Sequence, residues 1–274
     1  MEPLRFDPQL LAAGLSTHPV PLRHDLAGAS GFTVADVVAL AARLPTATME
    51  ATPARLPLLT PGGVPRIPVD REQIGAVATA DLRLGLLGLQ DIEPYGGGLR
   101  ACLAQVFAVA GMPEGPPQRD ETSIFLAAPG ATVPVHFDSH HNVLLQLAGT
   151  KELTIGWFSD AGAQARALET GCRSRKRMGH AVPPETTRFH LGPGDGLYIP
   201  PFALHWVHGG SEVSAALSCS FSTASTLRAE LVHTCNAQLR RVGLRPRPPG
   251  RSLRRDRAKV AAMRVAARVR AGGR

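Results

Sequence analysis

The sequence predicts a mainly β protein, a double-stranded β-helix (jelly-roll) core with flanking α-helices towards the N- and C-termini. Three observations predict this class. From residue 121 onward, short β-prone segments follow one another with turn residues between them. The chain contains 28 Gly and 24 Pro, which suits a fold with many turns. Its 274 residues are enough to bury the core of one large domain.

Residues 1–120 are expected to form a mixed α/β part that supports the barrel. Thr33 can cap a helix that runs to Leu44, because Asp36 stands three residues after the cap. Residues 82–89 predict a strand. The three glycines at 96–98 predict a loop, and residues 99–109 predict a second helix because their apolar residues recur at helical spacing.

Residues 121–224 are expected to form the jelly-roll core. Segment 161–187 interrupts its strands and is interpreted as an insertion over one end of the barrel, whose basic run at 173–177 is a solvated loop. Residues 225–274 predict two C-terminal helices, about 225–242 and 252–269, with a proline-rich break between them. The expected core strands are 122–127, 133–137, 142–147, 152–157, 188–191, 196–199 and 213–221.

The positive charge is concentrated in the C-terminal tail. The formal net charge is +8, yet residues 237–274 hold 13 Lys and Arg against the single acid Asp256, so the other 236 residues carry a net charge of −4. Such a tail can bind nucleic acid, but this one has no aromatic residue to stack on bases. We favour a solvated helix or one that packs in a homodimer, and nucleic acid is the alternative partner.

Composition also bears on the compartment. No apolar run approaches the roughly 20 residues that a membrane span needs, so we expect a cytoplasmic protein without membrane contact. The four cysteines are widely scattered, and no pair has the short spacing of a zinc knuckle or a redox motif. Reduced, structural thiols are therefore expected.

Candidate metal ligands stand on two separate strands. His136 and Asp138 are two residues apart in a β-prone segment and so project to the same face. His205 follows the turn, short apolar strand and proline bend of residues 194–201, which places a second imidazole at the barrel rim. Two neutral nitrogens and one carboxylate oxygen that leave three positions open are the donor set of non-haem Fe(II) oxygenases.

A lone His-x-Asp pair is a weak signal, because surface strands often carry one. Here the neighbours of His136 are apolar or small. A carboxylate on a buried strand is costly unless it is paired or bound to a metal, and this favours the metal interpretation.

Residues 121–222 resemble the jumonji-C/cupin-8 group of 2-oxoglutarate oxygenases, which includes the asparaginyl hydroxylase that acts on hypoxia-inducible factor. The matching pieces are HFDSHHN at 136–142, LLQLAGTK at 144–151, and the block from 194 to 205. The resemblance implies that His136, Asp138 and His205 bind Fe(II). It also implies that Lys151 pairs with the distal carboxylate of 2-oxoglutarate, and that Asn142 and Ser220 are further cosubstrate-pocket residues.

The chain departs from the family at one cosubstrate contact. Val133 stands where the hypoxia-factor hydroxylase has a threonine, and Thr132 is one place off. Another branch of these oxygenases uses an Arg-x-Ser motif after the second histidine, but residues 213–221 contain no arginine, so Lys151 is the expected cation. The additional histidines near the motifs are interpreted as non-ligands: His140, His141, His190 and His208.

The sequence thus predicts an enzyme, a 2-oxoglutarate-dependent dioxygenase that hydroxylates a protein side chain, an amino acid or a small metabolite. Its expected cofactor is Fe(II), with 2-oxoglutarate as small-molecule cosubstrate. Two alternatives stay open. One is a metal-dependent cupin enzyme that does not use 2-oxoglutarate, and the other is a non-catalytic cupin-type regulator whose basic tail binds nucleic acid.

Overall fold

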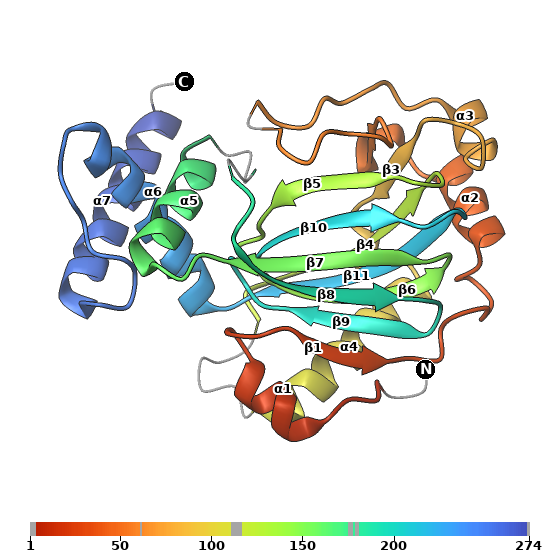
Figure 1. Cartoon of the computed structure of the whole chain (residues 1–274), viewed down its shortest axis with the longest axis horizontal. Coiled ribbons are helices and arrows are strands. Elements are labelled where there is room, and N and C mark those ends of the chain that lie inside the picture. The colour runs from red at the N-terminus through yellow and green to blue at the C-terminus, as the bar shows by residue number, and fades with distance from the viewer. Residues whose placement is uncertain (1–3, 61, 111–116, 175–177, 179–180, 273–274) are drawn as a thin grey trace.

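Two antiparallel β-sheets face each other and form the centre of the molecule (Figure 1). The structure, a computed structural model, describes residues 4–60, 62–110, 117–174, 178 and 181–272. The larger sheet has the strand order β1-β9-β6-β11-β4-β3-β2, and the smaller has the order β5-β10-β7-β8. The predicted jelly-roll class is confirmed. The strands are β1 Val20–Arg23, β2 Met49–Thr52, β3 Arg83–Leu86, β4 Arg119–Ala127, β5 Thr132–His136, β6 His141–Ala148, β7 Lys151–Trp157, β8 Glu185–Leu191, β9 Asp195–Ile199, β10 Leu204–Gly209 and β11 Ser214–Ser222.

The larger sheet has two different faces because side chains alternate along each strand. On β4, Ile124 and Leu126 are fully buried in the apolar cluster shared with the N-terminal helices, whereas Ser123 and Phe125 line a cavity between the sheets. The outer face is thus the apolar core, and the inner face is free to carry polar groups. The helices that contribute to this core are α1 Pro8–Gly14, α2 Val34–Arg43, α3 Arg71–Gly75 and α4 Tyr95–Ala110.

The starts of helices α2 and α4 have different local causes. Thr33 and Asp36 form the expected capping box at the start of α2. The predicted loop at 96–98 is wrong, because α4 already begins at Tyr95. The first turn of this helix packs tightly: a Cβ on Gly96 would lie 2.0 Å from the carbonyl oxygen of Gln90. Gly96 therefore serves close packing rather than a turn.

Strands from the first 120 residues complete the larger sheet. β3 pairs with β4, and β2 pairs with β3, so both extend the sheet beyond the core segment. β1 pairs with β9 at the opposite edge. The sequence indicated β3 but neither β1 nor β2: β1 contains Pro21, and β2 contains Glu50 and Ala51, residue types that are depleted in strands. The N-terminal part therefore contributes directly to the barrel.

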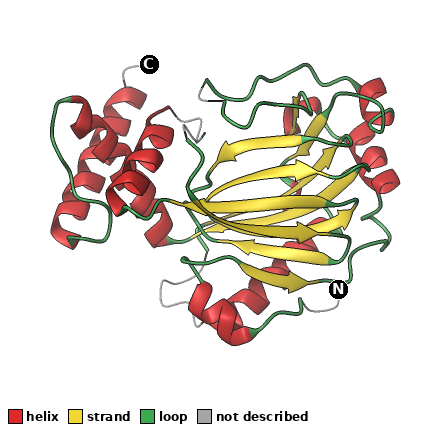
Figure 2. Cartoon of the chain, viewed as in Figure 1, coloured by secondary structure: helices red, strands yellow, loops and turns green. Residues whose placement is uncertain are grey.

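Three helices form a layer beside one end of the sheets (Figure 2). They are α5 Ala161–Ser174, α6 Ala224–Arg241 and α7 Leu253–Gly272. Glu169 of α5 is buried, accepts a hydrogen bond from Asn236 Nδ2 at 3.1 Å and pairs with Arg240 of α6. The predicted insertion thus contains α5, which packs against α6. Of its basic run, residues 175–177 lie outside the described residues. No described helix combines the length and apolarity needed to cross a bilayer.

Candidate active site

Three predicted ligands converge at the junction of β5 and β10. His136 is the last residue of β5, Asp138 follows two residues later, and His205 is the second residue of β10. His136 and His205 are cross-strand partners, and their ring centroids are 4.0 Å apart. One ligand atom from each of the three residues lies within 4.8 Å of the others. Such a cluster can enclose a single ion.

Backbone contacts fix both imidazoles in one orientation. His136 Nδ1 lies 2.9 Å from the carbonyl oxygen of Pro134, and His205 Nδ1 lies 2.9 Å from that of Ala203. A carbonyl oxygen only accepts hydrogen bonds, so each Nδ1 must carry the proton and donate it. Each Nε2 then presents a lone pair towards Asp138, whose Oδ2 lies 3.8 Å from His205 Nε2. Metal-bound histidines show the same arrangement of the second ring nitrogen.

Burial keeps the His136 imidazole available as a neutral donor. Desolvation, and then the neighbouring His205, lower the pKa of His136 to about 4, although Asp138 opposes the shift. His136 is therefore neutral at physiological pH, as a metal ligand must be. Two imidazoles and one carboxylate fit a cation that keeps open positions for other ligands, whereas a structural zinc would need four protein donors. The donor set therefore fits Fe(II).

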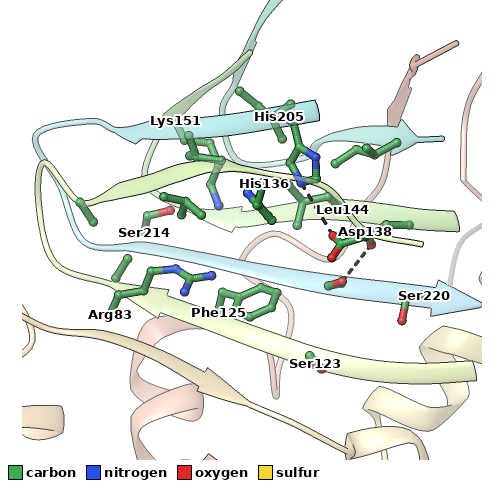
Figure 3. Close-up of a pocket in the computed structure, with 18 of the residues that line it drawn as sticks. Arg83, Ser123, Phe125, His136, Asp138, Leu144, Lys151, His205, Ser214 and Ser220 are labelled. Atoms are coloured by element: carbon green, nitrogen blue, oxygen red, sulfur yellow. Dashed lines mark hydrogen bonds and ion pairs between the residues drawn. The ribbon is translucent and has the colours of Figure 1, made fainter. Parts of the chain in front are cut away.

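A cavity of ≈ 380 Å³ extends from this cluster between the two sheets. At the metal end it is lined by Asn142 of β6, together with Ser218 and Ser220 of β11. Leu144, Phe125, Leu153 and Val207 form apolar walls further in. In Figure 3, Asp138 and Ser220 lie on one side of the view, and Lys151 and Arg83 lie on the other. The cavity thus joins a metal-ligand cluster to a cationic end.

Lys151, the cation that the family resemblance implied, lies at the end of the cavity away from the metal-ligand cluster (Figure 3). It is the first residue of β7 and lies four residues, roughly 13 Å along the strand, from Ile155, the cross-strand partner of His205. Desolvation, and then the nearby Arg83, lower the pKa of Lys151 to about 7. The side chain is half-buried and lines the cavity. Its charge is therefore poorly compensated when the cavity holds no anion.

The turn before Lys151 is tightly constructed. Gly149 has a φ of +64°, and a Cβ there would lie 2.3 Å from the carbonyl oxygen of Val213. The buried Gln146 donates from Nε2 to the carbonyl oxygens of Ala148 (2.6 Å) and Gly149 (3.1 Å). These contacts hold the start of β7 and so fix where Lys151 enters the cavity.

The remaining candidate residues fall into two groups. Asn142 and Ser220 line the cavity as expected, and Asn142 Oδ1 accepts a hydrogen bond of 2.8 Å from Ser218. His140 also lines it, with Nε2 3.9 Å from Asp138 Oδ2, outside the ligand cluster. His141 points to the opposite face of β6, where it stacks on Phe221. At the position of the missing threonine, Val133 lines the cavity and Thr132 does not.

Arg83 is the functional candidate that sequence reasoning missed. It belongs to β3, which reaches the cavity only because β3 pairs with β4: Arg83 stands opposite Ala127, which in turn stands opposite Ser214. All three side chains line the cavity. No local motif surrounds Arg83, so only the strand register could have revealed it.

Comparisons with known proteins place the same region of the chain in an oxygenase-type fold. Residues 117–231 match the family model described as JmjC domain. The Escherichia coli ribosomal oxygenase YcfD is similar in structure, with a TM-score of 0.55 and 15% identity over 97% of this chain and 68% of that chain. Its complex with cobalt and 2-oxoglutarate gives a TM-score of 0.55 and 16% identity, and its complex with cobalt and succinic acid gives a TM-score of 0.53 and 17% identity. Both alignments cover 96% of this chain and 68% of that chain. At these identities the likeness establishes the fold. No curated protein matches the sequence.

Proposed function

We propose that this protein is an Fe(II)- and 2-oxoglutarate-dependent oxygenase that hydroxylates an unactivated C–H bond, since residues 117–231 match the family model described as JmjC domain. The observation that carries the proposal is the pairing of two features in one cavity. A cluster of two histidines and one aspartate lies at one end, and the half-buried cationic side chains of Arg83 and Lys151 lie at the other. A 2-oxo dicarboxylate has complementary chemistry at its two ends.

Each residue then has a defined task. His136, Asp138 and His205 hold Fe(II), which when bound supplies the oxygen-activating chemistry that couples conversion of 2-oxoglutarate to succinate and CO₂ with hydroxylation of the substrate. Lys151 binds the distal carboxylate. Asn142 and Ser220 line the space beside the metal, where they can orient the cosubstrate or the substrate. The apolar walls between the two ends exclude water from the carbon chain.

The Escherichia coli structure in complex with cobalt and 2-oxoglutarate supports this assignment, because a protein of the same fold takes both a divalent metal and this cosubstrate. That protein is described as a ribosomal oxygenase. A side chain of a ribosomal protein is therefore the first substrate to test for the present chain, followed by free amino acids and small metabolites.

The principal alternative is a metal-dependent cupin enzyme without 2-oxoglutarate. An anaerobic titration of 2-oxoglutarate into Fe(II)-loaded protein separates the two. We expect a visible metal-to-ligand charge-transfer absorption that saturates with one equivalent of the cosubstrate. If the spectrum does not change while iron remains bound, the alternative is correct.

The affinity for 2-oxoglutarate should depend on pH through Lys151. Its pKa is lowered to about 7, so the free site is mainly protonated below pH 7 and mainly neutral above it. Arg83 and Glu50 share this cavity with Lys151, and Arg83 contributes to the shift. A second pocket that Lys151 lines contains Glu152, His190 and His208. A carboxylate favours the ammonium form, so binding above pH 7 takes up a proton, and the Kd should rise by up to about tenfold per pH unit.

Calorimetric titrations of the Mn(II)-loaded protein between pH 6 and pH 9 measure this effect. Binding heats in two buffers of different ionisation enthalpy report the proton uptake directly. A Lys151→Met variant serves as the control, because its affinity should be nearly independent of pH. A flat profile in the unmodified protein would contradict the role given to Lys151.

Helix α7 supports two partner proposals. Arg257, Arg264 and Arg268 line a groove between α6 and α7 that suits a nucleic-acid backbone. Val265 and Val269 on the same helix are 58% and 70% exposed and offer an apolar surface to a second copy of the chain. We favour the homodimer over nucleic acid; the sequence left a solvated helix and a dimer-packing helix both open.

Sedimentation velocity with and without a labelled oligonucleotide decides between these partners. We expect a dimer that a Val265→Glu, Val269→Glu variant converts to a monomer. Salt-dependent oligonucleotide binding would instead favour the nucleic-acid partner, provided that it is lost in an Arg257→Gln, Arg264→Gln, Arg268→Gln variant and kept in a charge-matched Arg251→Gln, Arg254→Gln, Arg255→Gln control.

A further inference from the structure

Arg83 is a cation placed inside the cavity without a counter-ion in contact. Its Cζ lies 4.9 Å from the centroid of the Phe125 ring, which leaves the guanidinium edge directed into the cavity (Figure 3). Among the described residues, no side chain or carbonyl forms a hydrogen bond or ion pair with this guanidinium. The nearby carboxylate of Glu50 is already paired with Arg66. The donors of Arg83 are therefore available to a bound molecule.

This arrangement is unfavourable unless an anion enters. An arginine stays charged at any physiological pH, and burying an unpaired charge is costly. Desolvation lowers the pKa of Arg83, and Arg83 in turn lowers the pKa of Lys151. Two mutually repelling cations therefore share one end of the cavity. A carboxylate placed between them would offset both the desolvation and the repulsion.

Ser214 adds a neutral donor at the same place. It stands in register with Arg83 through Ala127, and Figure 3 shows it between Arg83 and Lys151. Its Oγ accepts a hydrogen bond of 3.0 Å from the buried Gln146 Nε2. With the oxygen engaged as an acceptor, the hydroxyl proton can be donated to a ligand.

We propose that Arg83, together with Ser214, binds the distal carboxylate of the cosubstrate alongside Lys151, so that the chain uses a second cation where Val133 supplies no hydroxyl. The inference rests on the proposed function and deepens it by assigning the specificity of its cosubstrate pocket. A guanidinium can engage both oxygens of one carboxylate. The pocket should therefore select 2-oxo acids with a second carboxylate over 2-oxo monocarboxylates.

Calorimetric titration of Mn(II)-loaded protein with 2-oxoglutarate and with 2-oxobutyrate tests this selection, because only the first acid has a distal carboxylate. Arg83→Met should raise the Kd for 2-oxoglutarate at least tenfold and leave that for 2-oxobutyrate within about threefold, as expected when one partner of a buried charge pair is removed. Arg83→Lys should restore part of the loss. The control is Arg188→Met, which removes an exposed arginine on β8, 67% of whose side chain is accessible to solvent, and should change neither Kd.

The outcomes separate the two hypotheses. Unchanged 2-oxoglutarate affinity in Arg83→Met, with normal binding by the unmodified protein, would overturn the role of Arg83 and leave the proposed function intact. An equal loss for both acids would also overturn it, because the damage would then not concern the distal carboxylate. Failure of the unmodified, metal-loaded protein to bind 2-oxoglutarate would remove both proposals. A thermal unfolding scan of each variant without ligand verifies that the fold is retained.

Discussion

Asp138→Ala protein should form no measurable succinate from 2-oxoglutarate under conditions in which the unmodified enzyme turns over. Asp138 is the only carboxylate in the described ligand cluster, so its removal leaves two neutral imidazoles to hold a divalent cation. Mutation of an outer-shell partner of a metal ligand already lowers metal affinity or activity roughly 10–100-fold. Loss of a direct anionic ligand should lower them by more.

Metal content and succinate formation are measured on the same preparations. His140→Ala measures the cost of losing a neighbour of Asp138, because its Nε2 lies 3.9 Å from Asp138 Oδ2 but outside the cluster, and its Fe(II) affinity should fall by less than that of Asp138→Ala. Glu185→Gln, an exposed carboxylate on β8, controls for loss of charge. Full activity in Asp138→Ala would exclude the assigned metal site.

Lys151→Met should weaken 2-oxoglutarate binding by about 2–5 kcal/mol, the cost of removing one partner of a buried, hydrogen-bonded charge pair. This corresponds to at least a 30-fold rise in Kd, as roughly every 1.4 kcal/mol is a factor of ten. Methionine keeps the apolar stem that borders Leu153, so the cavity shape should change little. The affinity for the metal alone should be unchanged, because Lys151 lies at the opposite end of the cavity from Asp138 (Figure 3).

Titrations with Mn(II) alone and then with 2-oxoglutarate separate these two affinities. Lys151→Arg is the conservative comparison and should retain part of the binding. If the methionine variant binds 2-oxoglutarate as tightly as the unmodified protein, another group must neutralise the distal carboxylate, and Arg83 would be the first candidate.

The parts of the site that the sequence revealed are local in the chain. His136 and Asp138 are two residues apart on a strand, so the period of a β-strand alone places them on one face. Lys151 was assigned from the family resemblance, in which a Gly-x-Lys turn follows the metal motif, and here that turn is Gly149-Thr150-Lys151. His205 was found from a turn, an apolar strand and a proline bend, although its own strand β10 was not expected.

The parts that escaped depend on contacts between distant segments. Arg83 reaches the cavity through the pairing of β3 with β4, a register that no feature of residues 80–90 encodes. The glycines at the start of α4 were interpreted as a loop because their propensity favours one. The close approach of Gln90, which makes a side chain at Gly96 intolerable, is a tertiary constraint that overrides this propensity.

The pairing of β3 with β4 also bears on how far the chain can be shortened without losing the cavity and its covering helices. The stretch matched as a JmjC domain begins at residue 117, so excising it would leave Arg83 behind and strip the covering helices from Ile124 and Leu126. Without β1, β2 and β3, β9 and β4 would become the edge strands of the sheet, with unpaired backbone groups. Such exposed edges promote strand pairing between molecules and aggregation. The cavity position of Arg83 and the protection of the sheet edges both depend on elements upstream of the matched stretch, from α1 to α4, so neither is kept when the chain is trimmed to its boundaries.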